Sequence, residues 1–166
     1  KKFKTRDGED IYGYLTLPKG EIKRLIVYIH GGPYGIRDFD SYDFSEQYLA
    51  SKGAAILKVN FRGSGGYGKN FIEDSYNEWG GTLLNDIADA TKSVQKELGI
   101  GRENTCAFGA SYGGYAAIAM AYKYSDLYEC VAGGMGVYDL KILRDGSDGN
   151  IYTYNDDYEQ MAEDFW

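Results

Sequence analysis

The feature that most constrains the fold is a serine flanked by glycines where a strand is expected to give way to a helix. The motif is Gly109-Ala110-Ser111-Tyr112-Gly113. Before it, residues 105–108 have the pattern of a short buried strand, and after it residues 112–124 form an apolar segment with almost no polar face, as a buried helix requires. Glycines two residues either side of the serine let the strand and helix pass closely. The pattern predicts that Ser111 stands at the tip of a strand as a candidate nucleophile.

Strands and helices are expected to alternate along most of the chain. A hairpin is predicted over residues 3–17, with its turn at Asp7-Gly8. Further strands are predicted at residues 25–29, 54–61, 105–109 and 128–132, and helices at residues 41–52, 82–98 and 112–124. This alternation indicates an α/β fold with a mostly parallel sheet and helices on both faces.

One predicted helix has capping residues at its ends, and another has apolar residues on one side. Thr82 is expected to be the N-cap of the helix over residues 82–98, and Gly99 its terminator. The helix over residues 41–52 would place Phe44, Tyr48 and Leu49 on one side.

A second motif, His30-Gly31-Gly32-Pro33, directly follows the expected strand at residues 25–29. In hydrolases with a G-x-S-x-G turn, such a loop supplies one backbone N–H of the oxyanion hole, and the residue after the serine supplies the other. We therefore expect the N–H groups of Gly32 and Tyr112 to form this hole. His30 could instead be a general base, but it lies on the oxyanion side of the serine, so a loop-shaping role is preferred.

A glycine-rich stretch over residues 62–70 mimics two nucleotide-binding motifs. Gly63, Gly65 and Gly68 satisfy G-x-G-x-x-G, and Gly63 to Lys69 begins like a P-loop. The P-loop fails at Asn70, where a serine or threonine should bind magnesium, and no strand ending in an acidic residue follows at the spacing that a dinucleotide fold needs. A loop packed beneath the active site is the preferred interpretation.

Composition excludes several other functions. The net charge of −7 disfavours a nucleic-acid partner, and no apolar run is long enough to span a membrane. The acidic stretch over residues 145–164 fails the calcium-loop pattern, because Asn150 and Asp156 stand where glycine and glutamate belong, so a solvated surface is expected. Cys106 and Cys130 lack metal-ligand spacing, and reduced, buried thiols are preferred to a disulfide.

Taken together, the motifs resemble the catalytic domain of the prolyl oligopeptidase family, with an α/β-hydrolase fold, and especially its acylaminoacyl-peptidase and dipeptidyl-peptidase branches. The resemblance rests on the two motifs above, on the run from Asn60 to Gly68, on Trp79-Gly80-Gly81 and on Gly114-Tyr115. The start, Thr5-Arg6-Asp7-Gly8 with Gly13 to Pro18, is also similar to the beginning of that domain, and the match extends to about Leu140.

The resemblance implies a serine peptidase that cleaves short peptides through an acyl-enzyme on Ser111, without metal or cofactor. It implies that Tyr112 lines the pocket for the residue before the scissile bond, and that a β-propeller lies upstream. In this family the catalytic aspartate and histidine follow the serine, yet no histidine follows Ser111 here. We therefore expect residues 1–166 to be a partial catalytic domain that lacks its last strands and is inactive alone.

Two alternatives remain open. An esterase or lipase of the same fold is compatible with the Ser111 motif, although Pro33 and the run from Tyr112 to Tyr115 favour a peptidase. A non-catalytic binding module that has kept the fold is the other. A homo-oligomer is possible, and a soluble protein of the cytoplasm or periplasm is expected.

Overall fold

A single sheet of six strands organises residues 1–140, the part of the chain that the computed structural model describes. The strands are β1 (Lys2–Lys4), β2 (Asp10–Thr16), β3 (Arg24–Ile29), β4 (Ala54–Asn60), β5 (Thr105–Ala110) and β6 (Cys130–Gly134). The helices are α1 (Phe44–Ser51), α2 (Lys69–Glu73), α3 (Thr82–Leu98) and α4 (Tyr112–Lys123), with a 3₁₀ turn at Arg102–Asn104. The strand order is β1-β2-β4-β3-β5-β6.

The sheet is mostly parallel, as predicted. β1 and β2 form the expected antiparallel hairpin, and β2 also runs antiparallel to β4. The remaining neighbours, β4-β3, β3-β5 and β5-β6, are all parallel. In the β3-β5 pair, Ile29 stands opposite Gly109. The loops that leave β3 and β5 therefore emerge side by side at the carboxyl edge of the sheet, where α/β proteins place their sites.

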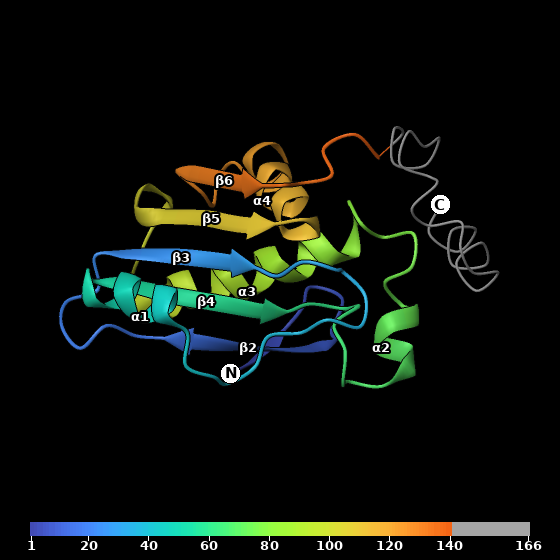
Figure 1. Ribbon diagram of the computed structural model, residues 1–166, viewed down its shortest axis with the longest axis horizontal. Coiled ribbons are helices and arrows are strands. Elements are labelled where there is room, and N and C mark those ends of the chain that lie inside the picture. Colours follow the sequence, from blue (N-terminus) through green and yellow to red (C-terminus); the bar gives the residue numbers. More distant parts are fainter. Residues whose placement is uncertain (141–166) are drawn as a thin grey trace.

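Helices cover both faces of the sheet, again as predicted. Figure 1 shows α1 in front of the sheet and α3 and α4 behind it. The rear layer contains the main core, in which Leu84, Ile87 and Met120 have no exposed surface. Such close packing of a parallel sheet against helices explains why all seven residues of β4 are buried.

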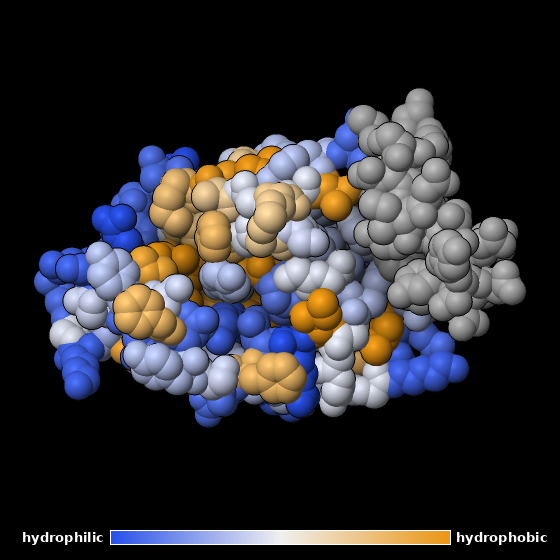
Figure 2. Space-filling model, in the orientation of Figure 1, coloured by the Kyte–Doolittle hydropathy of each residue, from blue (hydrophilic) through white to orange (hydrophobic). Residues whose placement is uncertain are grey.

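The front face is only partly covered. Beside α1 a hollow of about 840 Å³ opens over β3, β5 and β6, and Tyr28, Phe108, Val131 and Ala132 are among its lining residues. Figure 2 shows apolar side chains gathered over this part of the sheet. In the described residues β6 is the edge strand, which agrees with a sheet that lacks its last strands.

Two helix details differ from the prediction. α3 begins at Thr82, but the N-cap is Gly81, because the carboxylate of Glu78 accepts hydrogen bonds from the N–H and hydroxyl of Thr82. Gly99 does end the helix, in the left-handed conformation. In α1 the expected apolar side is largely exposed: Phe44 is 75% exposed and Tyr48 55%.

The buried side of α1 is instead held by charge. Glu46 is buried and forms an ion pair with Lys58 of β4, which is buried as well. Asp43 caps the helix by accepting a hydrogen bond from the N–H of Glu46 at 2.9 Å. Buried charges persist when they are paired, so α1 docks through this pair, together with Ala50 and Leu49 packed against Ile56, while its aromatic residues face outward.

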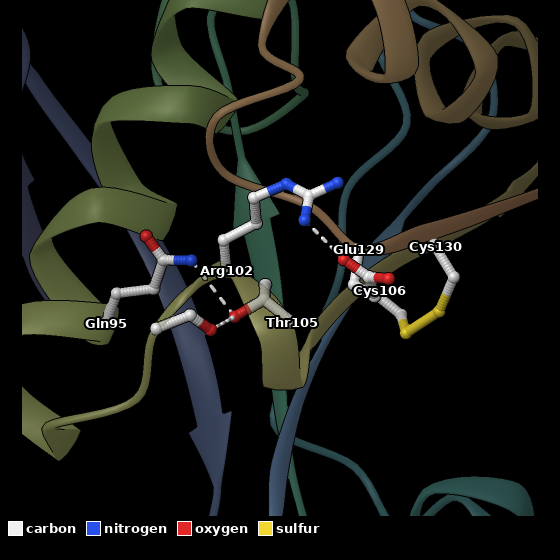
Figure 3. Close-up of a disulfide and its surroundings, with 7 residues drawn as sticks. Gln95, Arg102, Thr105, Cys106, Glu129 and Cys130 are labelled. Atoms are coloured by element: carbon white, nitrogen blue, oxygen red, sulfur yellow. Dashed lines mark hydrogen bonds and ion pairs between the residues drawn. A yellow bond between two sulfur atoms is a disulfide. The ribbon is translucent and has the colours of Figure 1, made fainter.

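The two cysteines form a disulfide, so the prediction of reduced thiols is wrong. Cys106 of β5 and Cys130 of β6 are directly opposite each other in the parallel pair, with Cα atoms 4.7 Å apart. Figure 3 shows the bridge near Glu129, which pairs with Arg102. The strand register brings the two sulfurs together across 24 residues of sequence.

Over residues 1–140, no helix has both the length and the apolar character needed to cross a membrane. The acidic stretch at residues 145–164 lies outside the described residues.

Candidate active site

Ser111 occupies the sharp turn between β5 and α4. Its backbone has φ 57° and ψ −125°, a conformation that costs a non-glycine residue about 1–3 kcal/mol. The residue is exposed, and its N–H donates a hydrogen bond to the carbonyl oxygen of Gly134, 3.0 Å away at the end of β6. The structure thus confirms that the serine sits strained and exposed at a strand tip, while its role as a nucleophile stays a prediction.

The two motif glycines are required by close backbone contacts. A Cβ on Gly113 would collide with the carbonyl oxygen of Ile29, and a Cβ on Gly109 would collide with the backbone of Gly113. Gly114 has a similar constraint, since its Cβ would lie 2.6 Å from the carbonyl oxygen of Gly134. Helix α4 therefore starts directly against the ends of β3, β5 and β6, which fixes Ser111 relative to all three strands.

The loop at residues 30–36, which we call the oxyanion loop, lies beside Ser111. A Cβ built on Gly31 would be 3.4 Å from Ser111 Cβ and 3.9 Å from its Oγ. Gly32 has φ 120°, which an L side chain rarely adopts, and it is exposed. Tyr112 is the first residue of α4, where backbone N–H groups have no partner within the helix. The two residues expected to form the hole thus come from elements that meet at Ser111, and their role stays a prediction.

His30 is fully engaged in holding the oxyanion loop. Its Nδ1 lies 2.7 Å from the carbonyl oxygen of Gly31, and its Nε2 lies 2.9 Å from Ser64 Oγ. The ring is buried and stacks on Phe61 with centroids 4.3 Å apart. Burial lowers the pKa of His30 below its usual value. With both nitrogens occupied and the ring neutral, His30 is suited to shaping the loop and unsuited to taking a proton from Ser111.

The glycine-rich loop, residues 61–68, packs against the oxyanion loop, in agreement with the preferred interpretation of its sequence. The N–H of Gly35 donates to the carbonyl oxygen of Gly63 at 2.9 Å. The N–H of Gly65 donates to the carbonyl oxygen of Ile36 at 3.0 Å. A side chain on Gly65 would collide with the Gly35 backbone. The glycines thus serve close contact between two loops of the protein.

A buried ion pair anchors the glycine-rich loop from below. Arg62 donates two side-chain hydrogen bonds to Asp86 of α3, from Nε at 2.9 Å and from its terminal nitrogen at 2.6 Å. Its backbone N–H donates to the same carboxylate at 3.0 Å. Asp86 has no exposed surface. A bidentate pair of this kind fixes direction as well as distance, so the loop is tied to α3.

The ring of Tyr112 lies in the core. It has no exposed surface, its hydroxyl donates to the carbonyl oxygen of Trp79 at 3.0 Å, and it contacts the rings of Phe61, Trp79 and Tyr115. This burial argues against the ring as a lining of the substrate pocket. Tyr112 can therefore take part in the site through its backbone N–H at the start of α4.

The sequence does not predict two residues that contact the site. Ser64, which bonds His30, stands within the apparent nucleotide motif, and Gly134, which holds the N–H of Ser111, stands in an ordinary strand. Neither carries a sequence signal of its own, because both contacts depend on how separate loops and strands meet in space.

Parallel strands, a strained serine between strand and helix, and a glycine loop beside it define an α/β hydrolase. The match to the model of the prolyl oligopeptidase family covers residues 40–164. The chain belongs to this family.

Individual proteins agree with this assignment. Dipeptidyl aminopeptidase BIII of Pseudoxanthomonas mexicana is 34% identical over 149 residues, covering 84% of this chain and 22% of the relative. A crystal structure of puromycin hydrolase is similar with a TM-score of 0.84 at 27% identity, covering 99% of this chain and 25% of that one. An acylaminoacyl peptidase in complex with Z-Gly-Gly-Phe-chloromethyl ketone is similar with a TM-score of 0.81 at 27% identity. The match covers 97% of this chain and 28% of that one. The chain thus spans about a quarter of the length of these proteins.

Proposed function

We propose that these residues are the nucleophile-bearing part of a serine peptidase acting on short peptides. The observation that carries the proposal is the strained, exposed Ser111 with Gly31 packed beside it and Gly32 next in the same loop. Two of the three similar proteins named above are a dipeptidyl aminopeptidase and an acylaminoacyl peptidase, which favours a peptidase over an esterase or lipase. The same similarity favours an enzyme over a binding module.

In the proposed reaction, Ser111 Oγ attacks the scissile carbonyl carbon and its proton passes to a general base. The carbonyl oxygen becomes negative and accepts hydrogen bonds from the N–H groups of Gly32 and Tyr112. Collapse of this tetrahedral intermediate breaks the C–N bond, releases the amine with the proton from the base, and leaves an ester on Ser111. Water then attacks the ester, releases the acid product and regenerates the serine.

The general base must come from elsewhere, because His30 is the single histidine of the sequence and both its nitrogens are engaged. We propose that residues 1–166 form a partial catalytic domain, completed by a C-terminal segment that carries the aspartate and histidine. The hollow beside α1 supports this, because apolar residues of β5 and β6 that line it, Phe108, Val131 and Ala132, would be covered in a complete domain. An upstream β-propeller and a homo-oligomer stay predictions.

The disulfide between Cys106 and Cys130 bears on the compartment in which the protein is found. Cross-links of this kind persist in oxidising environments such as the periplasm and are rare in the cytosol. Of the two compartments expected from the sequence, the Cys106–Cys130 bridge favours the periplasm.

A fluorophosphonate probe and an amide substrate test the proposal together. The complete polypeptide should gain the mass of one probe, and Ser111→Ala should gain none. The same protein should hydrolyse a dipeptidyl or acyl-peptide amide, with the activity lost in Ser111→Ala. An enzyme that is labelled but cleaves only esters would point to the esterase alternative, and an unlabelled, folded protein would point to a binding module.

A further inference from the structure

Ser64 connects the glycine-rich loop to the imidazole that holds the oxyanion loop. It has no exposed surface, and its Oγ lies 2.9 Å from His30 Nε2. The residues on either side of it, Gly63 and Gly65, make the two backbone hydrogen bonds to Gly35 and Ile36. Ser64 is therefore fixed relative to the oxyanion loop by its neighbours, and its hydroxyl can act on His30 from a defined position.

The hydrogen bonds of His30 allow only one arrangement of protons in the neutral ring. The carbonyl oxygen of Gly31 can only accept, so Nδ1 carries the proton and donates it. Nε2 is then an acceptor, and the hydroxyl of Ser64 must donate to it. The other tautomer would set the lone pair of Nδ1 against the lone pairs of the Gly31 oxygen, which is repulsive. The Gly31 oxygen thus selects the tautomer, and the Ser64 hydroxyl pairs with the remaining nitrogen and holds the ring in place.

We propose that Ser64 is a positioning residue for the oxyanion hole, acting through His30 on the loop that presents the Gly32 N–H. This inference rests on the proposed function, since it concerns the same site. Without the hydroxyl, Nε2 is buried with its acceptor unpaired, and the ring that holds Gly31 loses one of the two hydrogen bonds that fix its position. The peptide that carries the Gly32 N–H is then no longer fixed opposite Ser111.

Ser64→Ala in the complete polypeptide should lower kcat about tenfold or more for an amide substrate, with KM little changed. The reason is that oxyanion donors act mainly on the transition state, and small displacements of them are costly. Ser75→Ala is the matched control. Ser75 also has no exposed surface and lies near Gly63, but its hydroxyl donates to the carbonyl oxygen of Ile72. It should lose a similar amount of stability and keep its kcat.

A double-mutant cycle separates positioning from general structural support. In His30→Asn the side-chain amide N–H can replace Nδ1–H as the donor to Gly31 and has no ring nitrogen that needs Ser64. In that background, Ser64→Ala should change kcat by less than about twofold, whereas two independent effects would multiply.

The outcomes are distinct. Equal kcat for wild type and Ser64→Ala, or the same loss of kcat in Ser64→Ala and Ser75→Ala, overturns the inference. So does a full Ser64→Ala effect in the His30→Asn background. If the wild-type polypeptide is neither labelled at Ser111 nor active on amides, the proposed function itself has failed, which is visible before any Ser64 variant is measured.

Discussion

The backbone N–H of Ser111 is bonded at 3.0 Å to the carbonyl oxygen of Gly134, the last residue of β6. The first residue of the same strand, Cys130, is joined to β5 by the disulfide to Cys106. A strand of five residues is therefore attached to the nucleophile strand at both ends, by a covalent bond at one and by the nucleophile's own backbone at the other.

Removal of this disulfide should destabilise the protein. The bridge closes a loop of 24 residues, for which chain-entropy arguments give about 3 kcal/mol. We expect the Cys106→Ala/Cys130→Ala variant to lose about this much free energy of unfolding in urea titrations. Reductant should bring the wild type to the level of the variant and leave the variant unchanged. A wild type that is indifferent to reductant under the same conditions would contradict the prediction.

Gly113→Ala should be strongly destabilising, because its Cβ would collide with the Ile29 carbonyl oxygen and force α4 away from β3. Overpacking at such a contact costs about 1–3 kcal/mol, and labelling of Ser111 should fall with it. Gly20→Ala is the control, since a Cβ there meets nothing within 4 Å. Thermal unfolding of the two variants measures the difference, and equal melting temperatures would show that the close approach is not needed.

Asp86→Asn should cost about 3 kcal/mol, the lower end for breaking a buried pair, because the guanidinium of Arg62 loses its buried carboxylate and keeps only the half-exposed Asp7. The exposed pair of Arg102 and Glu129 offers a comparison of the same chemical type. Glu129→Gln should change the free energy of unfolding by less than about 1 kcal/mol. Denaturant titrations of both variants in parallel test this contrast, and similar losses would contradict it.

Asp38→Asn should stabilise the protein above pH 6. Burial raises the pKa of Asp38 to about 6, with Lys58 opposing the shift, and its Oδ2 has no hydrogen-bond partner among the described residues. The folded state therefore binds the proton more tightly than the unfolded chain, whose pKa is about 4. Stability is lost as pH rises from about 4 to about 6.

Asparagine at position 38 removes this ionisation. Unfolding measurements on wild type and Asp38→Asn should agree more closely at pH 4 than at pH 7, where the variant should be more stable by on the order of 1 kcal/mol. A variant that is less stable at pH 7 than at pH 4, relative to wild type, would show that the ionised carboxylate is favourable in the fold.

The elements that depend on local pattern were predictable from the sequence. Apolar runs ending in glycine located the strands, and the G-x-S-x-G motif placed Ser111 at a strand tip. The disulfide was not predictable, because the two cysteines meet only through the register of β5 against β6. The N-cap of α3 was misjudged for a related reason: Glu78 reaches back to Thr82 from a preceding turn whose shape the sequence does not reveal.

The pattern of apolar residues alone does not predict that Phe44 and Tyr48 of α1 are exposed. The ion pair between Glu46 and Lys58 decides which side of that helix meets the sheet. In the same way, the sequence of the glycine-rich loop gave no reason to connect Ser64 with His30, which lies 34 residues earlier in the chain.

The pairing of Ile29 with Gly109 has a consequence for how this site can vary. The oxyanion loop and the serine turn are far apart in the sequence, yet their spacing is set by two adjacent strands. An insertion in the connection between α3 and β5 would lengthen the path from one to the other without moving either. A shift of β5 by one residue along β3 would displace Ser111 and Tyr112 together relative to Gly32. The register of β5 against β3 therefore sets the spacing of the two loops, whereas the connection between α3 and β5 can change in length.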